Sequence, residues 1–112
     1  MLAKLPAHQK VLLDAADYIE KHGLAKNVRQ DKTGAVCVHG AISMICNERT
    51  SFLWPLRHEL EERACKALAN YLLANGVNSR LIVDGNGCGW WNNQSERTKE
   101  EVMNALRGAA LT

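Results

Sequence analysis

The side chains best able to do chemistry are four cysteines and four histidines, which together could hold a metal ion. Structural zinc sites usually include two cysteines separated by two to four residues. The cysteines of this chain lie much further apart, at Cys37, Cys46, Cys65 and Cys88. Cys37 and His39 form the one close pair, and on a helix two such side chains point about 200° apart. We therefore expect reduced thiols, no metal and no other cofactor.

Catalytic motifs are also incomplete. A cysteine nucleophile needs a partly exposed thiol near a base, whereas Cys37 and Cys46 lie at the two ends of an apolar run. The glycine-rich segment 85–89 follows the apolar residues 81–83, as a phosphate-binding loop would. A third glycine opening a helix is missing, and so is a G-K-[ST] sequence. The sequence therefore predicts a protein that is not an enzyme.

The charged residues argue against a nucleic-acid partner. Fourteen lysines and arginines against twelve acidic residues give a net charge of +2, which is too small to imply a polyanionic ligand. Between residues 48 and 66 the two signs are interspersed, and binding to phosphates requires clustered positive charge. A small DNA-binding regulator is therefore the alternative to our preferred interpretation.

Aromatic residues favour protein binding. Four of the six lie in two segments expected to connect helices, 52–55 and 90–91. Tryptophan and arginine are enriched at binding hot spots, and two adjacent tryptophans are seldom both fully buried. We expect a protein-binding surface that includes Phe52, Trp54, Arg57 and Trp90. A homodimer is one such assembly, because two-fold dimers are the commonest oligomers.

The element that must position these residues is the apolar stretch 36–46. It has no charged residue, and its apolar side chains point in almost every direction at helical spacing. Such a helix is surrounded by other elements, so we expect a buried central helix at 38–46. Residues 36–37 could instead be extended, because β-branched residues favour strands. They would then form one short β ladder with residues 81–83.

Three amphipathic helices are expected around this central helix. Proline at the first position and glycine or asparagine after the last mark the ends of two of them. Their expected ranges are 6–22, 55–74 and 98–108. The sequence thus predicts a mainly α fold, a small four-helix bundle in a single domain of residues 1–112.

The segment before the last helix contains a recognisable local motif. Thr98 and Glu101 have the spacing of a capping box, in which each side chain bonds the other residue's backbone N–H. Residues 90–93 are expected to be irregular, with Asn92 or Asn93 tying the loop to nearby backbone. We expect this segment to maintain the fold.

Nothing indicates a membrane location. No stretch approaches the roughly 18 uncharged residues of a membrane span, and the start lacks a secretory apolar region. We therefore expect a soluble, cytoplasmic protein.

The C-terminal part also resembles a known family. Trp91-Asn92-Asn93, Arg97-Thr98 and Glu101-Val102 resemble the W-N-D, R-T and E-V signature of an uncharacterised family of small domains. Two upstream segments, 13–23 and 37–42, are similar to its L-x-x-A-A-x-x-I-E-x-x-G and C-x-x-G-A patterns.

The resemblance implies a helical domain from actinobacteria or their phages. It assigns no catalytic residue, and Asn93 replaces the acid of the pattern. In a phage setting, the expected partner would be a host protein or a second copy of the chain. The residues expected to form the structural motif are Trp91, Asn92, Arg97, Thr98 and Glu101.

Overall fold

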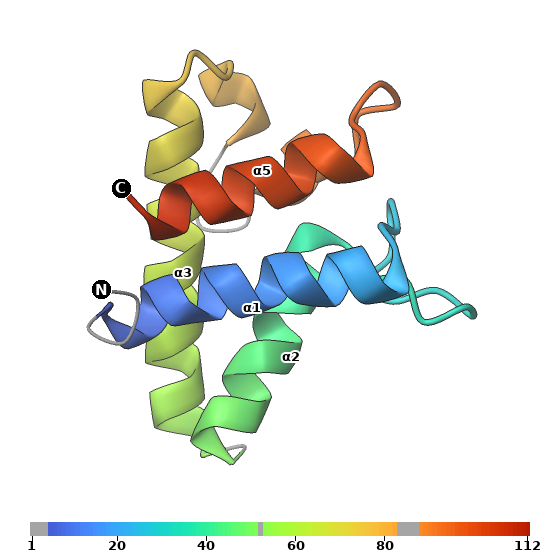
Figure 1. Ribbon diagram of the computed structural model, residues 1–112. Helices are drawn as coiled ribbons and strands as arrows, with labels where there is room; N and C mark the ends of the chain where they lie inside the picture. Colours follow the sequence, from blue (N-terminus) through green and yellow to red (C-terminus); the bar gives the residue numbers. More distant parts are fainter. Residues whose placement is uncertain (1–4, 52, 83–87) are drawn as a thin grey trace.

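A computed structural model describes residues 5–51, 53–82 and 88–112 and shows a mainly helical fold. In chain order the elements are α1 (Ala7–His22), α2 (Val38–Thr50), α3 (Trp54–Ala74), the 3-10 turn η2 (Ser79–Leu81), α4 (Cys88–Asn92) and α5 (Lys99–Ala110) (Figure 1). The predicted helical bundle is therefore confirmed. The described residues contain five α-helices, however, and not the four expected.

The additional helix is α4, which includes most of the segment predicted to be irregular. Its five residues make little more than one turn, too short for a 3.6-residue periodicity to appear in the sequence. The predicted end of α2 is also wrong, because the helix continues to Thr50. The hydroxyl of Thr50 donates to the carbonyl of Cys46 at 2.8 Å, and Arg49 pairs with Asp14 of α1.

Val36 forms β-bridges as expected for an extended residue, but its partners are not the predicted residues 81–83. It forms a parallel bridge with Leu24 and an antiparallel bridge with Gln30. Leu81 ends the 3-10 turn and Ile82 lies in a bend, while Val83 lies outside the described residues. The predicted ladder with 81–83 is therefore absent from the described part of that segment. A partner close in the chain costs less loop-closure entropy than one about 45 residues away.

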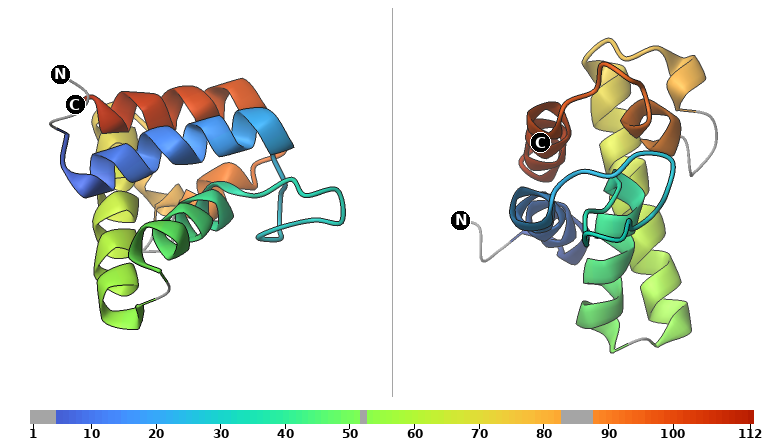
Figure 2. Two further views of the ribbon diagram at one scale, coloured as in Figure 1. Left: turned by 60° about the horizontal axis from the view of Figure 1, so that its bottom comes forward. Right: turned by 90° about the vertical axis from the view of Figure 1, so that its right-hand side faces the viewer.

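The helices form two layers. α1 and α5 lie side by side, and α2 and α3 lie against them in a second layer, with α3 crossing α1 and α5 at a steep angle (Figures 1 and 2). α1 packs against α5, α2 and α3, and α2 packs against α1, α3 and α4. Seven of the thirteen residues of α2 are buried. The expected burial of the 38–46 segment is thus observed, but α1 is equally central.

The α2–α3 pair is an antiparallel hairpin whose tip extends beyond α1 (Figure 1). Gly108 of α5 lies against Tyr71 of α3, where a Cβ atom would lie 2.2 Å from the Tyr71 hydroxyl. Within the described residues, no helix combines the length and apolar character needed to cross a bilayer.

Candidate functional site

Asn92 joins three parts of the chain around one buried amide. Its side chain is fully buried, and its Oδ1 accepts a hydrogen bond from the Val38 N–H at 3.0 Å. Its Nδ2 donates to the Ala25 carbonyl, also at 3.0 Å. The Val38 N–H lies in the first turn of α2, where backbone donors have no partner within the helix. Asn92 therefore satisfies the start of α2 and fastens α4 to the loop between α1 and α2.

Asn93 extends this arrangement. Its Oδ1 accepts from the Asn27 N–H at 2.7 Å and from the Asn92 Nδ2 at 3.1 Å. Asn27 has a φ of 66°, a left-handed conformation that asparagine tolerates well. The prediction that Asn92 or Asn93 ties the loop to nearby backbone is confirmed for both residues. An aspartate at 93 could accept the same two hydrogen bonds.

The rest of the C-terminal motif organises the start of α5. The Arg97 guanidinium lies 4.5 Å from the centre of the buried Trp91 ring, and its Nε donates to the Trp91 carbonyl at 3.2 Å. Arg97 also pairs with Glu101 at 3.0 Å. Thr98 and Glu101 form the predicted capping box, with both reciprocal bonds at 3.1 Å. These bonds hold the pKa of Glu101 below its ordinary value, the Thr98 N–H contributing most and Arg97 next.

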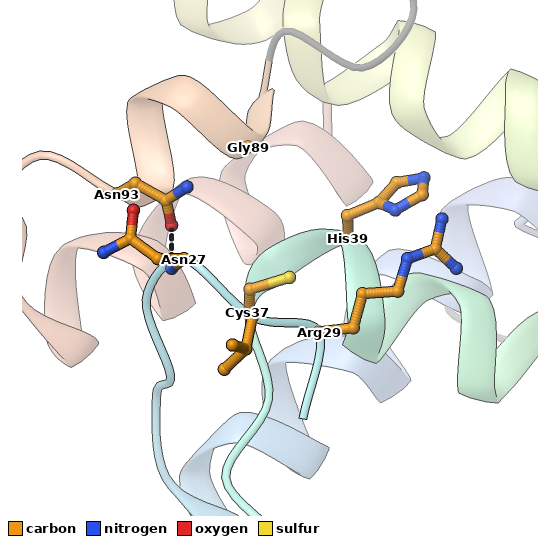
Figure 3. Close-up of a pocket in the computed structure, with 7 residues that line it drawn as sticks. Asn27, Arg29, Cys37, His39, Gly89 and Asn93 are labelled. Carbon is orange, nitrogen blue, oxygen red and sulfur yellow. Dashed lines mark hydrogen bonds between the residues drawn. The ribbon is translucent and has the colours of Figure 1, made fainter. Parts of the chain in front are cut away.

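A cleft opens where the α1–α2 loop, the start of α2 and α4 meet. Its volume is about 270 Å³, and its lining residues are Asn27, Val28, Arg29, Cys37, His39, Gly89 and Asn93 (Figure 3). Cys37 is the N-cap of α2, and its Sγ accepts a hydrogen bond from the Gly40 N–H at 3.2 Å. A Cβ atom at Gly40 would lie 2.3 Å from the Arg29 carbonyl oxygen. Glycine at 40 therefore allows the loop to pack directly on α2.

His39 connects the cleft to α3. Its Nε2 lies 3.0 Å from Glu61 Oε1, and the other Glu61 oxygen accepts from Arg57 at 3.2 Å. Burial lowers the pKa of His39, the charge of Arg29 lowers it further, and Glu61 opposes both effects. In Figure 3 the His39 ring points away from the Cys37 thiol. The cleft therefore does not place this imidazole as a base for that cysteine.

The other three thiols belong to the core. Burial raises the pKa of Cys46 and of Cys88 to about 12, and it also raises the pKa of Cys65. All four cysteines are unpaired. No cluster of three potential metal ligands from histidine, cysteine, aspartate or glutamate occurs among residues 5–51, 53–82 and 88–112.

The predicted binding residues are only partly brought together. Leu53, Trp54 and Leu56 lie at the tip of the α2–α3 hairpin and are 58%, 62% and 56% exposed. The Trp54 ring stacks on His58, with ring centres 5.3 Å apart. Arg57 lies within this tip but is engaged with Glu61. Phe52 lies outside the described residues.

Trp90 lies elsewhere. It lies on α4 and is 67% exposed. The first residue of α4, Cys88, packs against the middle of α3, with its thiol 3.9 Å from the Cys65 carbonyl oxygen. Cys65 follows Trp54 by eleven residues, a distance of roughly 16 Å along α3. Trp54 and Trp90 therefore belong to different parts of the surface, and the predicted set does not form one patch.

A family model now places the chain among its relatives. The model of DUF6197, a family of unknown function, matches residues 4–112. The chain belongs to DUF6197. This agrees with the resemblance to an uncharacterised family of small domains. Comparisons with curated proteins and with solved structures gave no match.

The cleft of this DUF6197 member was not predicted from its sequence. Arg29 and Asn27 lie in a polar loop without periodicity, so nothing local indicates that they face α2 and α4. One signal was present. Gly40 stands in the first turn of a helix, where glycine is unfavourable unless a close contact requires it.

Proposed function

We propose that this DUF6197 member acts by binding protein, without catalysing a reaction, and that it self-associates through the tip of the α2–α3 hairpin. The observation that carries the proposal is the position of Trp54. The buried residues Cys65 and Leu72 follow Trp54 by eleven and eighteen residues, which is close to three and to five helical turns, so all three lie on the same side of the helix. Trp54 therefore lies on the core-facing side of α3, although it is 62% exposed. Among the described residues, the apolar face of α3 continues past the end of the bundle and is exposed at Trp54.

The neighbours of Trp54 strengthen this surface. Leu53 and Leu56 are also more than half exposed, so three large apolar side chains are clustered within four residues. Fully burying one such side chain contributes about 1.5–3 kcal/mol. Interfaces gain most of their binding energy from a few aromatic and arginine anchors of this kind.

The charges around the tip favour a second copy of the chain as the partner. Arg57 pairs with Glu61 at 3.2 Å and Arg63 with Glu59 at 3.0 Å. Positive and negative groups therefore compensate one another locally, and two copies can face each other without strong repulsion. A two-fold contact of this type pairs the same surface on both subunits.

The setting of this activity is also a proposal. The sequence resemblance supports an actinobacterium or its phage, with the protein acting in the cytoplasm. A host protein is the second partner to test at the same tip. A role as a DNA-binding regulator has less support, because the acidic partners of the tip arginines would oppose phosphate binding.

The test is the effect of Trp54→Ala on mass in solution, measured by light scattering and sedimentation over a wide range of concentration. We expect the wild type to dimerise and the variant to dimerise about tenfold more weakly or worse, as for loss of a tryptophan anchor. Trp90→Ala is the matched control, because it removes an equally exposed tryptophan from a different element. Both variants should keep the helical circular dichroism spectrum.

Two outcomes would contradict parts of the proposal. A wild type that stays monomeric at every concentration would exclude self-association. If a host protein captured by the wild type then bound Trp54→Ala with unchanged affinity, the tip would not be the binding surface.

A further inference from the structure

The cleft beside α2 has an unbalanced set of charges. Among the described residues that line it, Arg29 is the one permanently charged group, and none carries a carboxylate. Two asparagine side chains, Asn27 and Asn93, supply polar groups on another wall (Figure 3). Glu61 of α3, the acid that contacts the lining residue His39, is already engaged by His39 at 3.0 Å and by Arg57 at 3.2 Å.

Two further features favour a negative charge in this cleft. α2 has thirteen residues and begins here, so the positive end of its dipole lies at the cleft, although its Val38 and Gly40 N–H groups already donate to Asn92 and Cys37. The backbone that carries Arg29 is fixed, because its carbonyl accepts from the Cys37 N–H at 3.1 Å and packs against Gly40. The Arg29 backbone is therefore held at the cleft by contacts that leave its guanidinium available to a ligand.

We propose that this cleft binds a small anionic ligand, with a carboxylate or a tetrahedral oxyanion group paired with Arg29 and lying beside His39. The volume of about 270 Å³ lies just below the usual range for drug-sized ligands, which favours a small metabolite. This site is separate from the hairpin tip, so the inference does not depend on self-association.

His39 provides a signature of the bound anion. Its imidazole faces Arg29 from the loop and Glu61 from α3, with Arg57 behind Glu61 and the Cys37 thiol in the same cleft. The charge of Arg29 is one of the causes that lower the pKa of His39. An anion beside Arg29 offsets that charge, so binding raises the pKa of His39. By linkage, affinity for the anion increases as the pH falls and His39 becomes protonated.

The experiment is a sodium sulfate titration followed by NMR, at constant ionic strength maintained with sodium chloride. We expect saturable shifts at the backbone amides of the cleft and an upward shift of the His39 titration. Arg29→Gln should weaken binding about threefold or more, as for loss of one charge pair in a solvated site. Arg29→Lys should retain most of the affinity. Arg63→Gln, which removes an exposed arginine from α3, should leave it unchanged.

Cys37 lines the cleft and is 7% exposed, and a ratio of two alkylation rates at its thiol provides a second readout in which its intrinsic reactivity cancels. The ratio of its alkylation by iodoacetate to that by iodoacetamide reports attraction of an anion into the cleft. In both reactions a carbon–sulfur bond forms, iodide leaves with the electron pair and the thiol proton passes to buffer. We expect Arg29→Gln to lower this ratio about threefold, and sulfate to slow iodoacetate more than iodoacetamide.

A parallel titration with sodium acetate separates the two ligand chemistries, since stronger binding of acetate or of sulfate identifies the preferred group. The inference is overturned if neither anion gives saturable shifts at the cleft. It is equally overturned if Arg29→Gln leaves both the affinity and the alkylation ratio unchanged, because the ion would then be adventitious only.

Discussion

At the scale of single residues, Asn92 connects segments that lie far apart in the chain. Its buried amide serves a donor at the start of α2 and an acceptor in the α1–α2 loop. These partners lie 54 and 67 residues away in the chain. A single buried side chain therefore connects α4, the start of α2 and the α1–α2 loop.

Replacing Asn92 by alanine should lower the free energy of unfolding by about 2–4 kcal/mol, because the Val38 N–H and the Ala25 carbonyl lose their buried partner. Urea denaturation followed by circular dichroism measures this change. Asn93→Asp is the control, since a carboxylate oxygen accepts the same two hydrogen bonds, and its effect should stay below about 1 kcal/mol. Equal losses in the two variants would show that Asn92 is not specially placed.

At the scale of elements, the C-terminal motif determines where α5 starts. Arg97 covers the Trp91 ring and pairs with Glu101, while Thr98 and Glu101 bond to each other's backbone N–H. The end of α4 and the beginning of α5 are thus connected through a single group of side chains. The motif that resembles a family signature has a structural explanation in these contacts.

Removing the cap with Thr98→Ala should destabilise the protein by about 1 kcal/mol, the usual value for an N-cap hydroxyl. Thermal denaturation measures it. Thr98→Ser, which keeps the hydroxyl, should restore most of the loss. If the alanine variant were as stable as the wild type, the box would be dispensable for α5.

Glu101 should make the stability that the α5 cap contributes depend on pH. Its pKa is lower in the folded protein than its ordinary value of 4.5, so its contribution is complete above about pH 4.5 and is lost as the pH falls through the folded pKa. The Glu101→Gln variant should therefore be less stable than the wild type above pH 4.5, and this difference in the free energy of unfolding should shrink as the pH falls below 4.5. A difference that is constant across the acid range would contradict this role.

At the scale of the whole molecule, the core thiols report on global opening. Cys46, Cys65 and Cys88 come from three different helices and are all buried where those helices pack. Because burial raises the pKa of Cys46 and Cys88 to about 12, these thiols stay protonated at pH 8 and react poorly in the folded protein.

Labelling with an aromatic disulfide reagent at pH 8 should therefore modify these three thiols only as fast as the protein unfolds. The rates, followed by mass spectrometry of the separate peptides, should rise together with urea concentration in parallel with the unfolding rate. Cys37, which lines the cleft and is 7% exposed, is followed in the same experiment. Labelling of Cys65 in advance of unfolding would show that the core opens locally.

The sequence by itself determined α1, α3 and α5 and the capping box at the start of α5. α1, α3 and α5 have amphipathic patterns within one window of 12 to 21 residues, and the capping box spans only four positions. The burial of α2 also followed from its own composition. Information of this kind is local, because periodicity and end signals depend on neighbours along one helix.

Only the tertiary structure decided the pairing of Val36, the presence of α4, the cleft and the separation of Trp54 from Trp90. Asn92 meets Val38 and Asn93 meets Asn27 across more than 50 residues of chain, and no local pattern encodes such contacts. Exposure of Trp54 is equally non-local. Its place on the core-facing side of α3 suggests burial, and it is exposed because the bundle ends before it.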